Sequence, residues 1–149
     1  MGYGSIVVGT DGSATAEKAV TQAAELAATD GARVVIVTAY TPGGADAIRD
    51  INEVPDEIRF ALTDRVQAEQ LAERGRVIAK GKGAPKVVVQ AIAGDPASVL
   101  LEAAKDFDAD LIVVGSRGLT SHAHFILGSV ASSVAHHAPC DVLVAHTTG

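Results

Sequence analysis

The sequence predicts one α/β domain built on a parallel sheet. Five short apolar runs are rich in β-branched residues and barely alternate with polar ones, as strands buried on both faces of a parallel sheet do: Ile6–Val8, Val34–Val37, Val87–Val89, Leu111–Val114 and Val142–Val144. Longer segments with helical spacing separate these runs, which gives the order β-α-β-α-β-α-β-α-β. At 149 residues a single domain, 1–149, is the default. We therefore expect right-handed crossovers and helices on both faces of the sheet.

The first helix is defined by signals at both of its ends. Ser13 is a plausible N-cap, and Glu17 lies in the early turns, where the helix dipole favours a negative charge. Gly31 is suited to end the helix in the left-handed conformation. Helical spacing predicts one apolar face made of Ala16, Ala19, Val20, Ala23 and Ala27.

The ends of the other helices are signalled less evenly by the sequence. One opens at Asp95-Pro96, an N-cap followed by proline, and the last runs from about Ser129 to Ala138 before a proline. The second helix, about Asp56 to Lys80, is noisier, because it carries many charges and a glycine at position 75. The preceding segment, Thr41 to Pro55, contains prolines and glycines and is predicted to be a surface loop.

Composition excludes several functional classes. The 12 basic and 18 acidic residues give a net charge of −6, which argues against a nucleic-acid partner, and aromatic residues make up only 3%. The single cysteine, Cys140, excludes an intramolecular disulfide framework and is expected to begin the last strand as a small core residue. No apolar run is long enough to span a membrane. Since Met1 to Ser5 also lacks the basic region of a signal peptide, we expect a cytoplasmic protein.

Two loops that follow predicted strands carry the candidate chemistry, because ligands of such sheets bind beyond the carboxyl ends of the strands. Gly9–Ser13 leads from the first strand into a helix, and Gly115-Ser116-Arg117-Gly118 follows the fourth. Nine residues, Leu119–Leu127, then precede Gly128-Ser129 at the start of the last helix.

The second of these loops is suited to bind an anion. A glycine at 115 permits a sharp turn and close approach to a ligand, and Gly128-Ser129 offers free N–H groups and a hydroxyl at a helix N-terminus. From Gly115 to the end, Arg117 and Asp141 are the only Asp, Glu, Lys or Arg residues, so backbone groups would do most of the binding. An ordinary glycine turn followed by an N-cap serine is the alternative interpretation.

These residues resemble a known family. Gly115-x-x-Gly118, a nine-residue gap and Gly128-Ser129 match the G-x-x-G-(x9)-G-[S/T] motif of ATP-binding universal stress proteins. The opening strand and loop, Ile6–Ser13, look like that family's opening strand and loop, and the resemblance extends to the terminal strand. It implies a Rossmann-like sandwich of the adenine nucleotide α-hydrolase type, with a five-stranded sheet of order 3-2-1-4-5.

The resemblance also implies a set of binding residues. Thr10 and Asp11 would lie against the adenosine, and backbone groups of Ala39 would meet the adenine edge. The ribose and phosphates would be bound by the glycine-rich residues and the start of the last helix: Gly115, Ser116, Arg117, Gly118, Gly128, Ser129 and the Val130 amide. Ala131 departs from relatives that carry a hydroxyl there, so one phosphate contact is missing. That weakens a preference for a triphosphate.

Asp11 has two possible roles that are compatible with each other. An Asx turn that organises the first loop is one, and coordination of Mg²⁺ carried by the nucleotide is the other. The histidines are weaker candidates: His122 and His124 are expected to be solvated, and His136-His137 suits the negative end of the last helix.

The function expected from these features is adenine-nucleotide binding, with ATP preferred, by a regulatory stress-response protein that acts through ligand-dependent conformation. Cyclic AMP is the alternative ligand. No catalytic residue is identified, since neither a P-loop nor a nucleophile elbow is present, although a slow ATPase or phosphotransferase and a dimeric interaction module remain open. A homodimer joined through the last strand, Val142, Leu143, Val144 and Ala145, is also expected.

Overall fold

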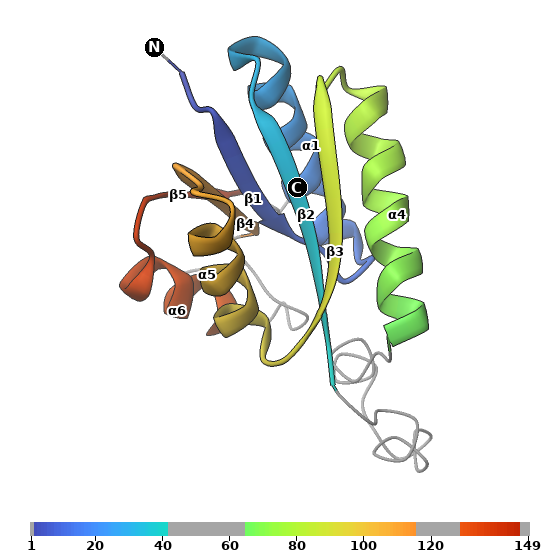
Figure 1. The fold of residues 1–149 in the computed structure, drawn as a ribbon, viewed down its shortest axis with the longest axis vertical. Coiled ribbons are helices and arrows are strands. Elements are labelled where there is room, and N and C mark those ends of the chain that lie inside the picture. Colours follow the sequence, from blue (N-terminus) through green and yellow to red (C-terminus); the bar gives the residue numbers. More distant parts are fainter. Residues whose placement is uncertain (1, 42–64, 116–128, 147–149) are drawn as a thin grey trace.

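The computed structural model describes residues 2–41, 65–115 and 129–146, and all statements below concern these residues. Five parallel strands form one sheet in the order β3-β2-β1-β4-β5, as the family resemblance implied. Strand β1, the first in the chain, therefore lies at the centre, and β3 and β5 lie at the two edges (Figure 1). The strands are β1 (Ser5–Gly9), β2 (Arg33–Tyr40), β3 (Lys86–Ala93), β4 (Leu111–Gly115) and β5 (Asp141–Ala145).

Four described helices cover the two faces of the sheet: α1 (Ala14–Asp30), α4 (Arg65–Gly81), α5 (Pro96–Asp106) and α6 (Ser129–His137). Helices α1 and α4 pack on one face, and α5 and α6 pack on the other (Figure 1). No described helix is both long and apolar enough to cross a membrane.

Two apolar layers hold these helices to the sheet. Alternate residues of β1 divide between them: Ile6 and Val8 join the layer under α1 and α4, and Val7 joins the layer under α5 and α6. The strands contribute Val and Ile, and the helices contribute mostly Ala. Small side chains on the helices allow close packing, so the core is filled without aromatic rings at its centre.

The predicted capping signals are confirmed. Ser13 is the N-cap of α1 and accepts the Ala16 N–H at 3.1 Å, and Gly31 ends that helix with φ of +71°. Asp95 caps α5 by accepting the Ser98 N–H at 3.1 Å. Ser13 and Asp95, which are unfavourable inside a helix, thus lie at the helix N-termini, where the free N–H groups need an acceptor.

Two expectations about element limits fall partly outside the described residues. The second predicted helix, about Asp56 to Lys80, is described only from Arg65 and ends at Gly81, and residues 56–64 lie outside the described part. Of the predicted loop from Thr41 to Pro55, only Thr41 is described.

Cys140 also differs from the expectation. It precedes β5 rather than beginning it, and its side chain is half-buried, not fully buried. An edge strand has no neighbour beyond it, so residues at its start stay partly open to water.

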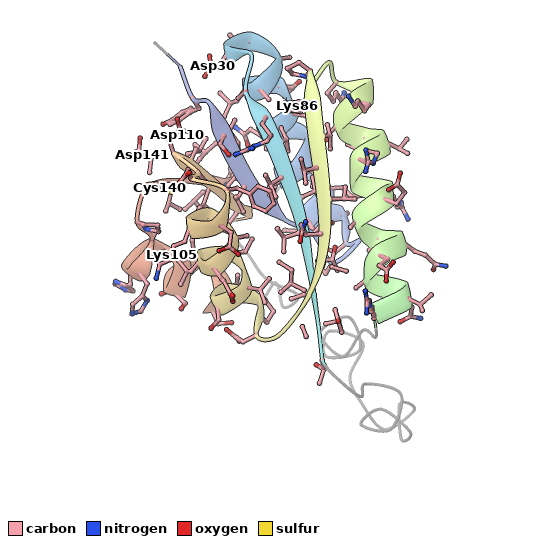
Figure 2. The ribbon with its side chains drawn as sticks, viewed as in Figure 1. Asp30, Lys86, Lys105, Asp110, Cys140 and Asp141 are labelled. Atoms are coloured by element: carbon pink, nitrogen blue, oxygen red, sulfur yellow. The ribbon has the colours of Figure 1, made fainter. Side chains whose placement is uncertain are left out.

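Acidic side chains bind the start of the chain at the amino-terminal end of the sheet. Asp110 accepts the N–H groups of Gly4 and Ser5 at 2.9 and 3.1 Å, and Asp30 accepts that of Tyr3 at 2.9 Å. Figure 2 shows Asp30 and Asp110 together at this end of the molecule. These negative charges are therefore placed at the edge opposite the carboxyl ends of the strands.

Candidate functional site

The carboxyl ends of β1 and β4 lie side by side at the point where the direction of the chain through the sheet reverses. Val8 of β1 pairs with Val113 of β4, and continuing this register places Thr10 beside Gly115. From β1 the chain passes to β2 on one side, while β4 lies on the other. A parallel sheet opens a crevice at such a switch point, and this is where the sequence placed the ligand.

The segment Thr10–Ser13, called the β1 loop below, is fixed to the sheet at its first residue. The Thr10 N–H donates to the Val37 carbonyl of β2 at 2.9 Å, and its Oγ1 accepts the Gly12 N–H at 3.1 Å. Thr10 is 8% exposed, and Gly12 has a φ of +82°, which favours glycine. The loop therefore turns tightly at the end of the strand and keeps its main chain close to the sheet.

Asp11 and Ser13 complete the turn into α1. Asp11 Oδ1 accepts the Ser13 N–H at 2.9 Å, so the Asx turn expected at this position is present. That bond leaves Oδ2 available, and Asp11 is half-exposed. The carboxylate thus organises the loop with one oxygen and keeps the other free for a further contact.

Ala39 presents main-chain groups to the same crevice. The Val37 carbonyl points toward β1, since it accepts the Thr10 N–H, and the Tyr40 carbonyl points toward β3, since it accepts the Gly94 N–H at 2.8 Å. Successive residues of a strand direct their N–H and C=O groups to opposite neighbouring strands, so those of Ala39 point to the same side as those of Val37, toward β1. Because β1 ends opposite Val37, these groups face the space beyond its end. An N–H and a C=O side by side are the groups that can pair with the edge of a purine.

The start of α6 is the third component. Strands β4 and β5 are parallel, so the helix between them runs back and begins at the carboxyl edge. Ser129, its first residue, is exposed and Val130 is half-buried. The first turn holds no acidic residue and the last turn holds His136 and His137, as the sequence indicated. Free N–H groups without a competing carboxylate suit an anion.

Ala131 is 2% exposed and packs in the apolar layer beneath α6. A hydroxyl at this position would begin inside that layer, so alanine is the side chain that fits the packing. The predicted binding residues Ser116, Arg117, Gly118 and Gly128 lie outside the described residues, as do His122 and His124. The structure therefore places Thr10, Asp11, Ala39, Gly115, Ser129 and Val130.

A magnesium ion at this site would depend on the nucleotide for most of its ligands. Within the described ranges no three His, Cys, Asp or Glu side chains gather closely enough to hold a metal. Mg²⁺ often binds proteins through one carboxylate, substrate phosphates and water, and the free oxygen of Asp11 fits that pattern.

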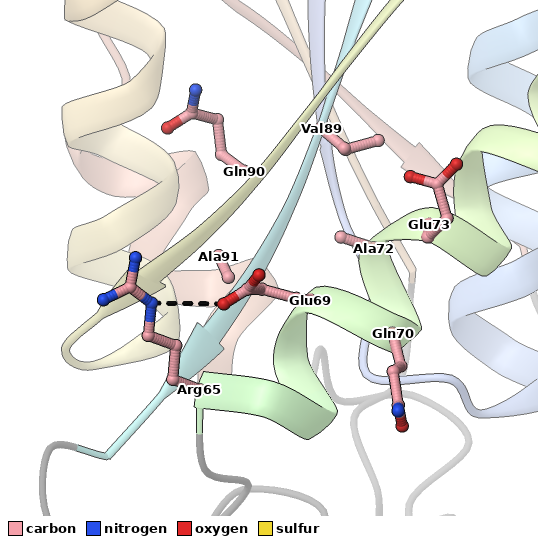
Figure 3. Close-up of a pocket in the computed structure, with 8 residues that line it drawn as sticks. All are labelled: Arg65, Glu69, Gln70, Ala72, Glu73, Val89, Gln90 and Ala91. Atoms are coloured by element: carbon pink, nitrogen blue, oxygen red, sulfur yellow. Dashed lines mark hydrogen bonds and ion pairs between the residues drawn. The ribbon is translucent and has the colours of Figure 1, made fainter.

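A hollow of about 480 Å³ lies elsewhere, between α4 and the edge strand β3. Figure 3 shows Arg65 and Glu69 paired along α4 on one side of it, with Nε and Oε1 3.1 Å apart. Their side chains are 73% and 57% exposed, so water solvates the charges and the pair contributes little to binding or stability. All of the residues that line the hollow belong to α4 and β3, and none belongs to β1 or β4.

Three residues around the β1 loop were missed by sequence reasoning. Leu71 and Gly75 of α4 pack against the loop and the middle of β2, and Thr38 of β2 is buried at 1% exposure with no described hydrogen-bond partner for its Oγ1. Gly75 was the one available signal, because a glycine inside a helix often marks a close packing contact.

Comparison with known proteins matches this chain to one protein family over nearly its whole length. A family model described as the universal stress protein family matches residues 2–146. The universal stress protein Rv1636 of Mycobacterium tuberculosis is 38% identical over 146 residues, which cover 98% of each chain.

Solved structures agree with this match. A universal stress protein in complex with cAMP is 34% identical, with a TM-score of 0.75 over 99% of this chain and 100% of that one. The Archaeoglobus fulgidus universal stress protein in complex with dAMP is 27% identical, with a TM-score of 0.69 over 97% and 98%.

Proposed function

Since this chain belongs to the universal stress protein family, we propose that it binds an adenine nucleotide in the crevice between β1 and β4. The observation that carries the proposal is the meeting of three main-chain features at one sheet edge. These are the β1 loop, the outward-facing N–H and C=O of Ala39, and the N-terminus of α6. Relatives over 25% identical whose structures contain cAMP and dAMP support the adenine nucleotide class.

Within this class we propose two candidate ligands. A nucleotide with one phosphate, such as cyclic AMP, needs few phosphate contacts, which agrees with an alanine at 131 and with the ligands of the two relatives. ATP is favoured by the complete motif from Gly115 to Ser129. With ATP, the free oxygen of Asp11 would share Mg²⁺ with the phosphates.

Each part of the nucleotide has a candidate partner. Adenine would pair with the Ala39 main chain and rest against aliphatic walls, because the chain has few rings on which a base could stack. The ribose would lie near Thr10, Asp11 and Gly115. The phosphates would be bound by Ser116, Arg117, Gly118, Gly128, Ser129 and the Val130 amide.

We propose a regulatory role rather than turnover. Asp11 is the one carboxylate of the β1 loop; one of its oxygens accepts the Ser13 N–H, and the other is the oxygen assigned above to Mg²⁺. General-base catalysis needs a group free to take a proton from the attacking water. A ligand that binds one conformation better than another shifts the population, which is sufficient for a stress-response protein.

The test is to identify nucleotide released from the purified protein by mass spectrometry, and to titrate ATP and cyclic AMP by calorimetry. Gly128→Asp would place a carboxylate where we expect a phosphate and should abolish binding. Ser129→Ala should weaken it, whereas Ser98→Ala, in the first turn of α5, should leave it unchanged. No binding at millimolar concentration, or full affinity in both site variants, would overturn the proposal.

We further propose a homodimer joined through β5. The strand lies at the sheet edge, and Val142, Leu143 and Val144 are half-buried apolar residues with backbone groups free to pair on one side. Sedimentation velocity at micromolar concentration should give a dimer, and Leu143→Lys, which places a charge on the apolar edge strand, should shift it toward monomer. A wild-type monomer under these conditions would contradict the proposal.

A further inference from the structure

Helix α4 forms a wall behind the β1 loop, on the side away from β4. It packs on the same sheet face as α1 and contacts both α1 and β2 (Figure 1). Two of its consecutive turns face the loop and its surroundings, through Leu71 in one turn and Arg74 and Gly75 in the next. None of the three belongs to the nucleotide motif, so their contacts are separate from the ligand contacts proposed above.

Leu71 covers the turning point of the loop. A Cβ built on Gly12 would lie 2.5 Å from Leu71 Cδ2, so the leucine methyl occupies the space that a side chain would need. Leu71 is half-buried, and the loop residue it covers has a φ of +82°. The methyl group therefore lies directly on the glycine at the sharpest point of the turn.

Gly75 brings the helix close enough for this contact. A Cβ at this position would lie 2.9 Å from Ile36 Cγ2 and 3.6 Å from Thr10 Cγ2. The missing side chain lets the α4 backbone approach the middle of β2, at Ile36, and the Thr10 side chain, one turn beyond Leu71. The glycine that weakens the helix by propensity thus sets its distance from the β1 loop.

An ion pair joins the same turn of α4 to the first turn of α1. Arg74 Nε lies 2.8 Å from Glu17 Oε2, and the Glu17 side chain is only 27% exposed. The β1 loop runs directly into α1, so α4 is connected both to the turn of the loop and to the helix that follows it.

We propose that Leu71 is a positioning residue for the nucleotide site, holding the β1 loop in its binding conformation from behind. This inference rests on the proposed function and names a residue of the same site that touches no ligand. Without the leucine methyls, the turn at Gly12 keeps the hydrogen bonds to Thr10 Oγ1 and Asp11 Oδ1 but loses its packing contact with α4. The loop then samples other conformations, and each nucleotide binds only the fraction of molecules that retain the right one.

The first arm of the test needs no ligand. Amide hydrogen exchange is measured by NMR in the full-length protein at Gly12 and Ser13, with the Gly94 amide as internal reference. In Leu71→Ala we expect exchange at Gly12 and Ser13 to be about tenfold faster and Gly94 unchanged, because only the local opening becomes easier. Val77→Ala, a 68% exposed position on the same helix, is the matched control and should change neither.

The second arm measures calorimetric affinity for cyclic AMP and ATP, at a temperature where circular dichroism shows every variant to be folded. Leu71→Ala should weaken both ligands about tenfold, as expected if about one molecule in ten keeps the competent loop. Leu71→Val should give a smaller loss, and Leu71→Met should restore most of the affinity. A merely structural role would lower the melting temperature without changing the affinity of folded protein.

The two arms separate the possible failures. Unchanged exchange at Gly12 and Ser13 in Leu71→Ala overturns the positioning role whatever the affinities are. Faster exchange with unchanged affinity overturns it too, since the loop would then not limit binding. If the wild type binds no nucleotide, the proposed function fails and the positioning role for a nucleotide fails with it, while the exchange result still reports whether Leu71 holds the loop.

Discussion

The two confirmed helix caps allow the stability and binding contributions of the β1 loop to be separated. Ser13 caps α1 beside the proposed nucleotide, and Asp95 caps α5 at a different connection of the chain. Both accept the N–H three residues onward at 3.1 Å, and both have extended backbone conformations. Ser13→Ala and Asp95→Ala therefore remove the same kind of hydrogen bond at two different places.

The expected stability loss is of similar size for both variants, and slightly larger for Asp95→Ala because Asp95 also accepts the Ser98 hydroxyl at 3.1 Å. Replacing an N-cap by alanine costs about 1 kcal/mol, because one N–H of the first turn loses its acceptor. For a chain of 149 residues the unfolding entropy near the midpoint is about 0.3 kcal/mol per kelvin, so each variant should melt about 3 °C lower. Differential scanning calorimetry at neutral pH measures the shift.

Their effects on nucleotide binding should differ. Ser13→Ala loosens the end of the β1 loop, where the Ser13 N–H also bonds Asp11 Oδ1, and we expect affinity for cyclic AMP and ATP to fall about threefold to tenfold. Asp95→Ala should leave affinity unchanged. Equal affinity losses in the two variants, or a loss only in Asp95→Ala, would refute the assignment of the loop to the site.

Three further predictions concern the rest of the fold. Arg33→Met should lower the free energy of unfolding by about 2 kcal/mol in chemical denaturation, because the guanidinium donates to the Phe107 carbonyl at 2.6 Å and lies 5.3 Å from the centre of its ring; a loss under 0.5 kcal/mol would contradict this. Burial raises the pKa of the Cys140 thiol, so at pH 8 the thiol should react with a disulfide reagent more slowly than free cysteine does. Unfolding in urea should restore the full rate. A rate in the folded protein equal to that of free cysteine would contradict this prediction. The Tyr3 hydroxyl donates to Asp141 at 3.0 Å, which raises the pKa of Tyr3. The bond stabilises the fold below the ordinary tyrosine pKa and is lost as pH rises through the raised value, so the melting temperatures of the wild type and Tyr3→Phe should converge in that alkaline range. A difference that stays constant with pH would count against the bond.

Much of the fold could be predicted because its local signals agree with one another. Unalternating runs such as Val34–Val37 mark strands buried on both faces, and Ser13, Gly31 and Asp95 stand at helix ends where their chemistry is required. The strand order came from the family resemblance, since helix and strand alternation alone does not fix it.

The surroundings of the β1 loop could not be predicted in the same way. Thr10, Asp11 and Ser13 follow a strand directly, so the sequence indicates their role. Leu71 and Gly75 act through contacts with residues far away in the chain. A mid-helix glycine is a local defect in the sequence, and only the packed structure shows that the Ile36 side chain of β2 occupies the space beside it.

Cys140 illustrates a related difficulty. Its place at the start of a predicted strand and the small apolar character of cysteine predicted a core position, but burial of a residue beside an edge strand depends on what lies next to that strand. Sequence periodicity reports which face of an element is apolar. It does not report whether a neighbouring element covers that face.

The central claim is that an adenine nucleotide lies at the carboxyl ends of β1 and β4, and amide NMR during a titration with cyclic AMP or ATP tests it most directly. The account predicts saturable shifts concentrated at Thr10–Ser13, Ala39, Gly115 and Ser129, with little change along the hollow between α4 and β3. Shifts centred instead on Arg65 and Glu69 of that hollow, or no shifts at millimolar ligand, would contradict it.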